Sequence, residues 1–205
     1  NLITKHREQK TMHQRDLALE SERIILGIDP GTQILGYGLI RIIGKRAEFI
    51  DMGVLNLRKE RDHFKKLQLI TENVTALIER FSPDELAVEA PFYGVNPQTM
   101  LKLGRAQGAA IASALLKDIP VCEYAPRSVK LAITGRGSAS KEQVAMMVKS
   151  MLNIDILPEF LDATDALAIA MCHYLTGKNA LAGRGNGTSW ENFVKNNPDR
   201  IKPSK

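Results

Sequence analysis

The chain contains only two cysteines, Cys122 and Cys172, among 205 residues, and only 5% of its residues are aromatic. Two cysteines are too few for a disulfide-stapled scaffold. Both fall in apolar segments that we expect to be a buried strand and a helix, so we predict free thiols in the core. The four histidines are scattered without the spacing of zinc ligands, and they indicate no histidine-based metal site.

Long hydrophobic runs are also lacking. The longest apolar stretches, such as residues 165–175, are shorter than the roughly 20 residues that a membrane-spanning helix needs. Residues 1–22 carry scattered charges instead of the apolar centre of a signal peptide. We therefore expect a soluble cytosolic protein. With 44% hydrophobic residues, the chain can bury one substantial core, so a single domain with tails is predicted.

The net charge of +5 is unevenly distributed along the chain. Residues 24–175 contain 17 basic and 17 acidic residues, whereas residues 176–205 contain six basic residues against two acidic ones. A neutral central region is a weak argument for a polyanionic partner. The argument becomes stronger if bound divalent cations neutralise some of the acidic side chains.

The pattern of apolar residues predicts an α/β domain. Three strands at 24–28, 35–43 and 47–55 are separated by glycine-bearing turns and form an antiparallel meander. Helical spacing then alternates with short apolar runs, which requires crossover connections and parallel strands. The expected elements are helix 67–81, strand 85–88, helix 97–117, strand 120–124 and helices 127–133, 140–153 and 162–176.

This pattern divides the chain into three parts. Residues 23–177 form the expected domain, a mixed sheet flanked by helices. Residues 1–22 are interpreted as an N-terminal extension that is disordered or foreign to the native chain. Residues 178–205 are rich in Gly, Asn, Ser and Lys, and we expect a flexible basic tail that adds nonspecific phosphate contacts.

Four carboxylates stand at the ends of apolar elements. Asp29 closes the first strand before a Pro-Gly turn, and Glu89 closes strand 85–88. An acid after a strand is often only a loop residue. Asp162 and Asp165 share one face at the start of a nearly all-apolar helix. A favourable interaction with the helix dipole would explain one aspartate at this helix start, but it explains the presence of both less well.

If the four carboxylates converge, their mutual repulsion requires cations. Oxygen ligands suit a hard cation such as Mg²⁺, for which Mn²⁺ can substitute. Two such ions about 4 Å apart activate water and stabilise the leaving oxygen in phosphodiester hydrolysis. The sequence therefore favours a metal-dependent nuclease, provided that these side chains meet in space.

Four segments, in this order, resemble the RuvC family of Holliday junction resolvases over about residues 23–175. They are Ile28-Asp29-Pro30-Gly31-Thr32, Gly36-Tyr37-Gly38, Val88-Glu89 and Asp162-Ala163-Thr164-Asp165-Ala166-Leu167-Ala168. The resemblance implies an RNase H-like mixed five-stranded sheet and a homodimer. It also implies catalytic metal ligands at Asp29, Glu89, Asp162 and Asp165, and paired symmetric nicks in four-way DNA junctions during recombination and repair.

The resemblance also assigns roles in DNA binding. Phe92 matches an aromatic that stacks on a base near the junction centre, and its Pro/Gly/Asn-rich surroundings, which include Asn96, suggest an exposed loop. Lys130 and Lys141 match lysines near the scissile phosphate. The alternatives are a core aromatic and two solvated lysines. The Gly/Ser-rich loop with Arg136 and Ser138, where Ser140 and Gln143 form a capping box, offers amide groups to a phosphate.

Gly104, Gly108 and Ala112 form a stripe of small residues on the expected helix 97–117. The stripe packs either on the protein's own sheet or on a second helix. In RuvC proteins this helix contributes to the dimer, and two-fold symmetry suits a junction, so we predict a homodimer. The resemblance further implies a RuvAB-type branch-migration complex as a partner, and a bacterial cytosolic location.

Three other functions fit parts of the sequence. Asp-x-Gly-Thr before a Gly-rich strand also opens the actin-like and sugar-kinase ATPases, but these need a second, related domain. A non-enzymatic DNA-binding module would lack one of the carboxylates, and all four are present. Other RNase H-like nucleases and resolvases remain the nearest alternative, although RNA-guided members carry large insertions that this chain lacks.

Overall fold

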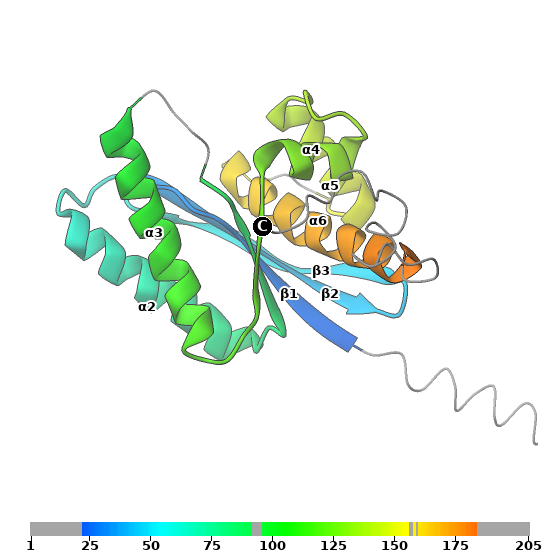
Figure 1. The fold of residues 1–205 in the computed structure, drawn as a ribbon, viewed down its shortest axis with the longest axis horizontal. Helices are drawn as coiled ribbons and strands as arrows, with labels where there is room; N and C mark the ends of the chain where they lie inside the picture. The colour runs from blue at the N-terminus through cyan, green and yellow to red at the C-terminus, as the bar shows by residue number, and fades with distance from the viewer. Residues whose placement is uncertain (1–21, 92–95, 156–157, 159, 184–205) are drawn as a thin grey trace, which may run out of the picture.

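The computed structural model describes residues 22–91, 96–155, 158 and 160–183. A central sheet separates two layers of helices, with α2 and α3 on one side and α4, α5 and α6 on the other (Figure 1). In chain order the elements are β1 (Glu22–Asp29), β2 (Ile34–Ile43), β3 (Arg46–Asn56), α2 (His63–Phe81), β4 (Glu85–Glu89), α3 (Pro97–Leu115), β5 (Val121–Tyr124), α4 (Pro126–Thr134), α5 (Lys141–Leu152) and α6 (Leu161–Gly183).

The sheet has five strands in the order β3-β2-β1-β4-β5. The first three strands pair antiparallel as the predicted meander, and β4 and β5 add to β1 in parallel. The predicted mixed sheet is therefore confirmed. Because β1 and β4 run in the same direction, with Ile28 opposite Val88, the residues that follow them, Asp29 and Glu89, emerge at the same end of the sheet.

Alternation along the strands decides which layer each side chain meets. On β1, Leu26 and Ile28 join the core under α2 and α3, whereas Ile25 joins the core under α4, α5 and α6. On β4, Val88 faces α2 and α3, and Ala87 faces the opposite layer. Side chains alternate every two residues along a strand, so Asp29 and Glu89 point toward the layer that contains α6.

Helix α6 lies unusually close to the sheet because three strand residues beneath it lack side chains. A Cβ atom at Gly27 would overlap the carbonyl oxygen of Ala166, and one at Gly36 would overlap that of Asp162. A Cβ at Gly38 would lie only 2.7 Å from atoms of Leu167. The Gly-x-Gly segment of β2 therefore allows the backbone of α6 to rest directly on the strands.

A chain of polar contacts fixes α6 further along its length. His173 Nε2 lies 2.9 Å from Glu85 Oε2 on β4, and its Nδ1 lies 2.7 Å from the hydroxyl of Tyr124 on β5. Arg23 of β1 donates to the Glu85 carboxylate at 3.1 and 3.2 Å. Burial is the main cause that raises the pKa of Tyr124 to about 12, so its hydroxyl stays protonated at neutral pH.

Two predictions from the sequence need correction. Cys172 is buried as predicted, but Cys122 is exposed because β5 is an edge strand with its centre open to solvent. Helix α6 continues to Gly183, past the helix end predicted at residue 176. Within the described ranges, no helix combines the length and the apolar character needed to cross a bilayer.

The close contact between Gly36 and α6 gives a first prediction. Gly36→Ala should destabilise the fold by about 1 to 3 kcal/mol, because the new methyl group meets backbone at Asp162 that a rotamer change cannot move. Chemical unfolding measures this loss. Gly177→Ala is the control on the same helix, where the nearest atom to a new Cβ is the Arg23 guanidinium at 3.8 Å, so stability should rise by up to about 1 kcal/mol. Equal stability of Gly36→Ala and the wild type would refute the close-packing argument.

Candidate active site

The site begins where β1 and β4 end side by side. Asp29 is the last residue of β1 and Glu89 the last of β4, and both side chains line one pocket. Across the sheet Asp29 pairs with Gly36 of β2. The same glycine lies beneath the carbonyl of Asp162, so the close approach of α6 brings its first turn to the carboxylates of the sheet.

The other two predicted acids lie in the first turns of α6. Asp165 lines the same pocket as Asp29 and Glu89. Asp162 does not line this pocket, but its charge acts on both Asp29 and Asp165. The Thr164 hydroxyl donates a hydrogen bond to the backbone carbonyl oxygen of Leu161 at 2.7 Å, which helps to fix the turn between the two aspartates. The structure thus brings Asp29, Glu89 and Asp165 into one pocket and leaves Asp162 beside it.

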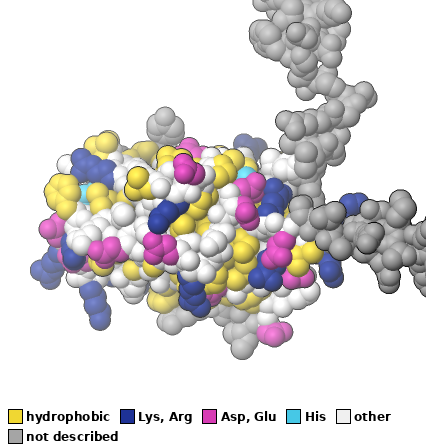
Figure 2. All heavy atoms as spheres, turned by 90° about the horizontal axis from the view of Figure 1, so that it is seen from below, with side chains coloured by type: hydrophobic (Ala, Val, Ile, Leu, Met, Phe, Trp, Pro, Cys, Tyr) yellow, Lys and Arg dark blue, Asp and Glu magenta, His cyan; other side chains and the backbone are white. Residues whose placement is uncertain are grey.

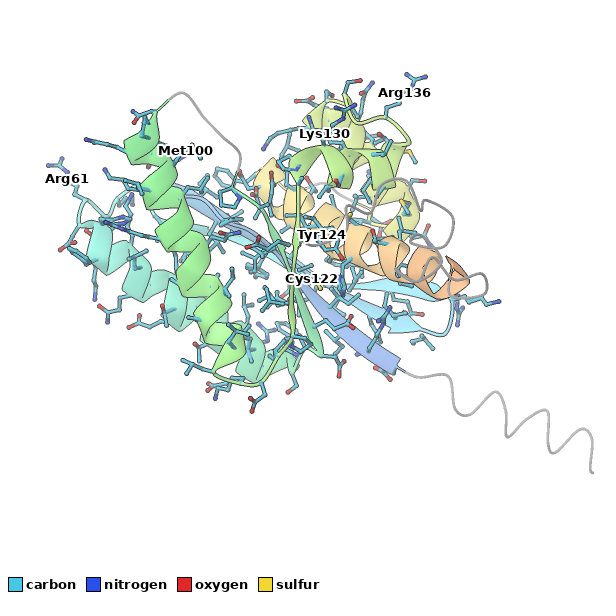
Figure 3. The ribbon with its side chains drawn as sticks, viewed as in Figure 1. Arg61, Met100, Cys122, Tyr124, Lys130 and Arg136 are labelled. Carbon is cyan, nitrogen blue, oxygen red and sulfur yellow. The ribbon has the colours of Figure 1, made fainter. Side chains whose placement is uncertain are left out.

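Two lysines complete the pocket. Lys141 opens α5 after the predicted capping box of Ser140 and Gln143, which is confirmed. Its Nζ atom lies 2.6 Å from Asp165 Oδ2, while the side chain remains 57% exposed. Lys130, on α4, lines the same pocket, and its positive charge acts on Glu89 and Asp165. Figure 3 shows Lys130 on α4, in the helical layer that also contains α6.

The pocket has a volume of about 220 Å³ and combines acids, lysines and an apolar floor. The apolar part comes from helices α4, α5 and α6, which exclude water from one side of the carboxylates. Its lining residues are Asp29, Glu89, Pro126, Val129, Lys130, Lys141, Val144, Asp165 and Ala168.

Burial and mutual repulsion both disfavour ionisation of these acids. Burial is the main cause that raises the pKa of Asp29 well above its ordinary value, and the charges of Glu89 and Asp165 add to the rise. The pKa values of Glu89 and Asp165 are raised for the same first reason. For Lys141 burial acts to lower the pKa, but contacts with Asp165 outweigh it and raise the pKa. A cation placed among the acids would relieve this repulsion.

The donor set fits a hard divalent cation, because it consists of carboxylate oxygens around a small, partly buried space. In the described residues, however, no three Asp, Glu, His or Cys side chains are arranged as a metal-ligand set. Instead, Lys141 supplies the positive charge next to Asp165. Three of the four predicted ligands share the pocket, and one of them, Asp165, is held by its ion pair with Lys141.

The residues predicted to bind DNA occupy different positions. Asn96 caps α3, and its side-chain oxygen accepts from the amides of Gln98 and Thr99. Arg136 and Ser138 are exposed on the loop between α4 and α5, and Figure 3 places Arg136 at the same end of the molecule as Lys130. Phe92 lies outside the described residues, so its stacking role stays a prediction.

Gln107 is a positioning residue that the sequence did not reveal. It is 94% buried on α3, and its amide nitrogen donates to the backbone carbonyl of Glu89 and to Glu123 Oε1, both at 3.0 Å. This side chain therefore holds the end of β4 from the side opposite α6. One signal was available, since Gln107 lies between Ala106 and Ala110 on the face that packs against the core.

The β3-β2-β1-β4-β5 sheet, with carboxylates at the ends of β1 and β4 and on the packed helix α6, is that of the RNase H-like class. Comparisons with known proteins identify the family. The family described as crossover junction endodeoxyribonuclease RuvC matches residues 25–173. The RuvC protein of Christiangramia forsetii is 54% identical over 184 residues, which make up 90% of this chain and 95% of that protein.

The RuvC protein of Bacteroides fragilis is also 54% identical, over 183 residues that cover 88% of this chain and 97% of that protein. Among solved structures, Thermus thermophilus RuvC in complex with a Holliday junction substrate matches with a TM-score of 0.72 and 32% identity. That match covers 77% of this chain and 96% of the other. The chain therefore belongs to the RuvC family of crossover junction endodeoxyribonucleases.

The raised pKa of Asp29 predicts a pH-dependent stability. Because the folded state favours the protonated acid, this contribution is fully present below the ordinary pKa of 3.8 and is lost as the pH rises through the raised value. Without divalent ions, Asp29→Asn should therefore be more stable than the wild type at neutral pH, and this advantage should shrink toward pH 4. Urea unfolding in a chelator at several pH values measures the difference.

The control is Asp118→Asn, at an exposed left-handed turn position that asparagine tolerates. Its stability should follow that of the wild type across the same pH range. If the stability of Asp29→Asn falls with rising pH in parallel with that of the wild type, burial and repulsion of the Asp29 carboxylate are not a significant cost of folding.

Proposed function

We propose that this protein is an endonuclease that resolves four-way DNA junctions by paired, symmetric nicks, using Mg²⁺ held by Asp29, Glu89, Asp162 and Asp165. The observation that carries the proposal is a pocket in which Asp29, Glu89 and Asp165 meet beside two lysines, with the charge of Asp162 acting on two of these acids. Membership of the RuvC family supports the substrate, because relatives are crossover junction endodeoxyribonucleases and one solved RuvC contains a Holliday junction.

The chemistry follows from the charges in the pocket. Bound Mg²⁺ would supply an activated water and stabilisation of the leaving oxygen. The four acids provide the negative charge that holds the cations, and Mn²⁺ provides equivalent binding chemistry. Lys141 is held beside Asp165, from which its ammonium can move to the scissile phosphate, and Lys130 neutralises charge on the other side of the pocket.

DNA reaches this pocket along the surface where α4 ends and α5 begins. Arg136 and Ser138 are exposed there and contribute phosphate contacts, with Asn96 across the pocket at the start of α3. Phe92 follows Glu89 by three residues, which fits the proposed stacking on a base at the crossover. Junctions of this kind form on bacterial chromosomes, so the protein acts in the cytosol, together with a RuvAB-type complex that moves the branch point.

Symmetric nicks require two active sites, and helix α3 offers a surface for a second copy. A Cβ added at Gly104 or Gly108 meets no atom within 4 Å, so this stripe does not pack on the protein's own sheet. Beside it, Leu101 is 64% exposed and Leu115 56% exposed. The combination of small residues and exposed leucines suits close packing of α3 against its symmetry mate.

The carboxylates can be tested one at a time. Asp29→Asn, Glu89→Gln, Asp162→Asn and Asp165→Asn should each reduce junction cleavage by about 10²- to 10⁴-fold, which corresponds to several kcal/mol of transition-state stabilisation. Junction affinity measured in Ca²⁺ should remain, because it comes from phosphate contacts. Single-turnover cleavage of a synthetic four-way junction in Mg²⁺ measures the loss.

Glu72→Gln, an exposed carboxylate on α2, is the matched control and should cut at the wild-type rate. Near-normal cleavage by one of the four variants would remove that residue from the site. A wild-type protein that cuts linear duplex or RNA–DNA hybrid as fast as the junction would contradict the proposed substrate.

The dimer is tested by Gly108→Leu. Because this position is open in the protomer, the variant should fold with wild-type stability but dimerise at least tenfold more weakly, corresponding to about 1 to 3 kcal/mol of overpacking. Sedimentation equilibrium measures the dimer, and paired cutting of a cruciform plasmid measures its consequence. A variant that stays dimeric at wild-type concentrations would exclude this stripe as the contact.

A further inference from the structure

A second pocket, of about 360 Å³, lies at the same end of the sheet but on the opposite helical layer. Its walls are the turn between β1 and β2, the beginning of α2 and the first two turns of α3. That turn starts directly after Asp29, so the pocket lies next to the active site along the chain. Its lining residues are Thr32, Gln33, Arg61, His63, Lys66, Thr99 and Lys102.

The pocket concentrates positive charge. Arg61, Lys66 and Lys102 line it, and within the described part of the chain none of the three has a carboxylate within ion-pair distance. The nearest acids in sequence are occupied elsewhere. Asp62 accepts from the amides at the start of α2, and Glu60 accepts from the amide of Asp62 at 2.8 Å.

One of these cations is fixed in place. Lys66 is half-buried, and its Nζ donates to the carbonyl oxygen of Thr32 at 2.7 Å. This bond holds the ammonium at the pocket wall without neutralising its charge. Hydroxyl groups of Thr32 and Thr99 and the amide of Gln33 add neutral donors and acceptors. Proteins commonly contact phosphate oxygens with Lys or Arg side chains together with neutral hydrogen-bond donors.

The location of the pocket distinguishes DNA from other phosphate sources. Figure 3 shows Arg61 at the left of the molecule, beside the start of α2, and Lys130 and Arg136 in the upper part, on the layer that contains α4 and α5. The face seen from below, in contrast, mixes Lys and Arg with Asp and Glu (Figure 2). In the described part of the chain, no carboxylate lies within ion-pair distance of Arg61, Lys130 or Arg136, so both helical layers carry unpaired cations.

We propose that the pocket formed by Arg61, Lys66 and Lys102 binds a backbone phosphate of the junction DNA, on the side of the active site opposite to α4 and α5. The inference rests on the proposed function, because it assigns the site to the same substrate. The contact anchors DNA that the catalytic pocket does not hold. It contributes to affinity and leaves the chemical step unchanged.

Binding of a synthetic four-way junction in Ca²⁺ tests the pocket. Lys102→Gln is the main variant, because this side chain is exposed and its removal does not threaten folding. The dissociation constant should rise about five- to tenfold near 0.1 M salt, and the slope of log K against log salt should fall by about 0.9. Lys66→Gln should behave alike, and single-turnover cleavage at saturating enzyme should match the wild type for both.

Lys65→Gln is the matched control, because it removes the same charge one residue away. Lys65 points along the exposed face of α2, where its Nζ contacts Gln68 at 2.9 Å, and it does not line the pocket. The affinity of Lys65→Gln for the four-way junction should differ from that of the wild type by less than about twofold. An equal loss in Lys65→Gln, or wild-type affinity and salt slope in Lys102→Gln, would overturn the proposal.

Junctions that carry single neutral methylphosphonates locate the contact. At the phosphate bound by the pocket, neutralisation should weaken the wild type but not Lys102→Gln. Equal losses for both proteins at every position would also reject the pocket. The wild-type protein is measured first. If it neither binds nor cuts junctions, the proposed function itself is refuted. If it does both, the variants test the pocket alone.

Discussion

The direct packing of α6 on the glycine-bearing strands is the constraint on which the site depends. A side chain at Gly27 or Gly36 would overlap backbone of α6, so larger residues would lift the helix from the sheet. The same contact brings the acids at its first turns to the end of β1, where Asp29 lies opposite Gly36. Stability and the geometry of the proposed catalytic site therefore depend on the same close approach.

This packing places like charges together at a cost to the fold. Burial and repulsion raise the pKa of Asp29, and Lys141 offsets part of that repulsion through Asp165. The polar chain from Arg23 through His173 and the buried amide of Gln107 hold α6 and β4 from both sides. The surrounding structure thus keeps the carboxylates in an arrangement that a divalent cation would stabilise.

Much of this could be predicted from the sequence, because periodicity and turns are local signals. The strand ends at Asp29 and Glu89 and the helix start at Asp162 were all readable. The reason for the Gly-x-Gly segment was not, since it depends on a helix about 130 residues away. Cys122 was misplaced because an apolar run does not distinguish a central strand from an edge strand. The basic pocket was missed because its cations are distant in sequence.

The central claim is that the acids of β1, β4 and α6 form one divalent-cation site. Anomalous diffraction from crystals grown with Mn²⁺ tests it most directly, because the metal is located independently of the protein atoms. The account predicts Mn²⁺ coordinated by Asp29 and Glu89 together with Asp162 or Asp165, with Lys141 released from Asp165. Metal bound elsewhere, with the ion pair between Lys141 and Asp165 intact, would contradict it.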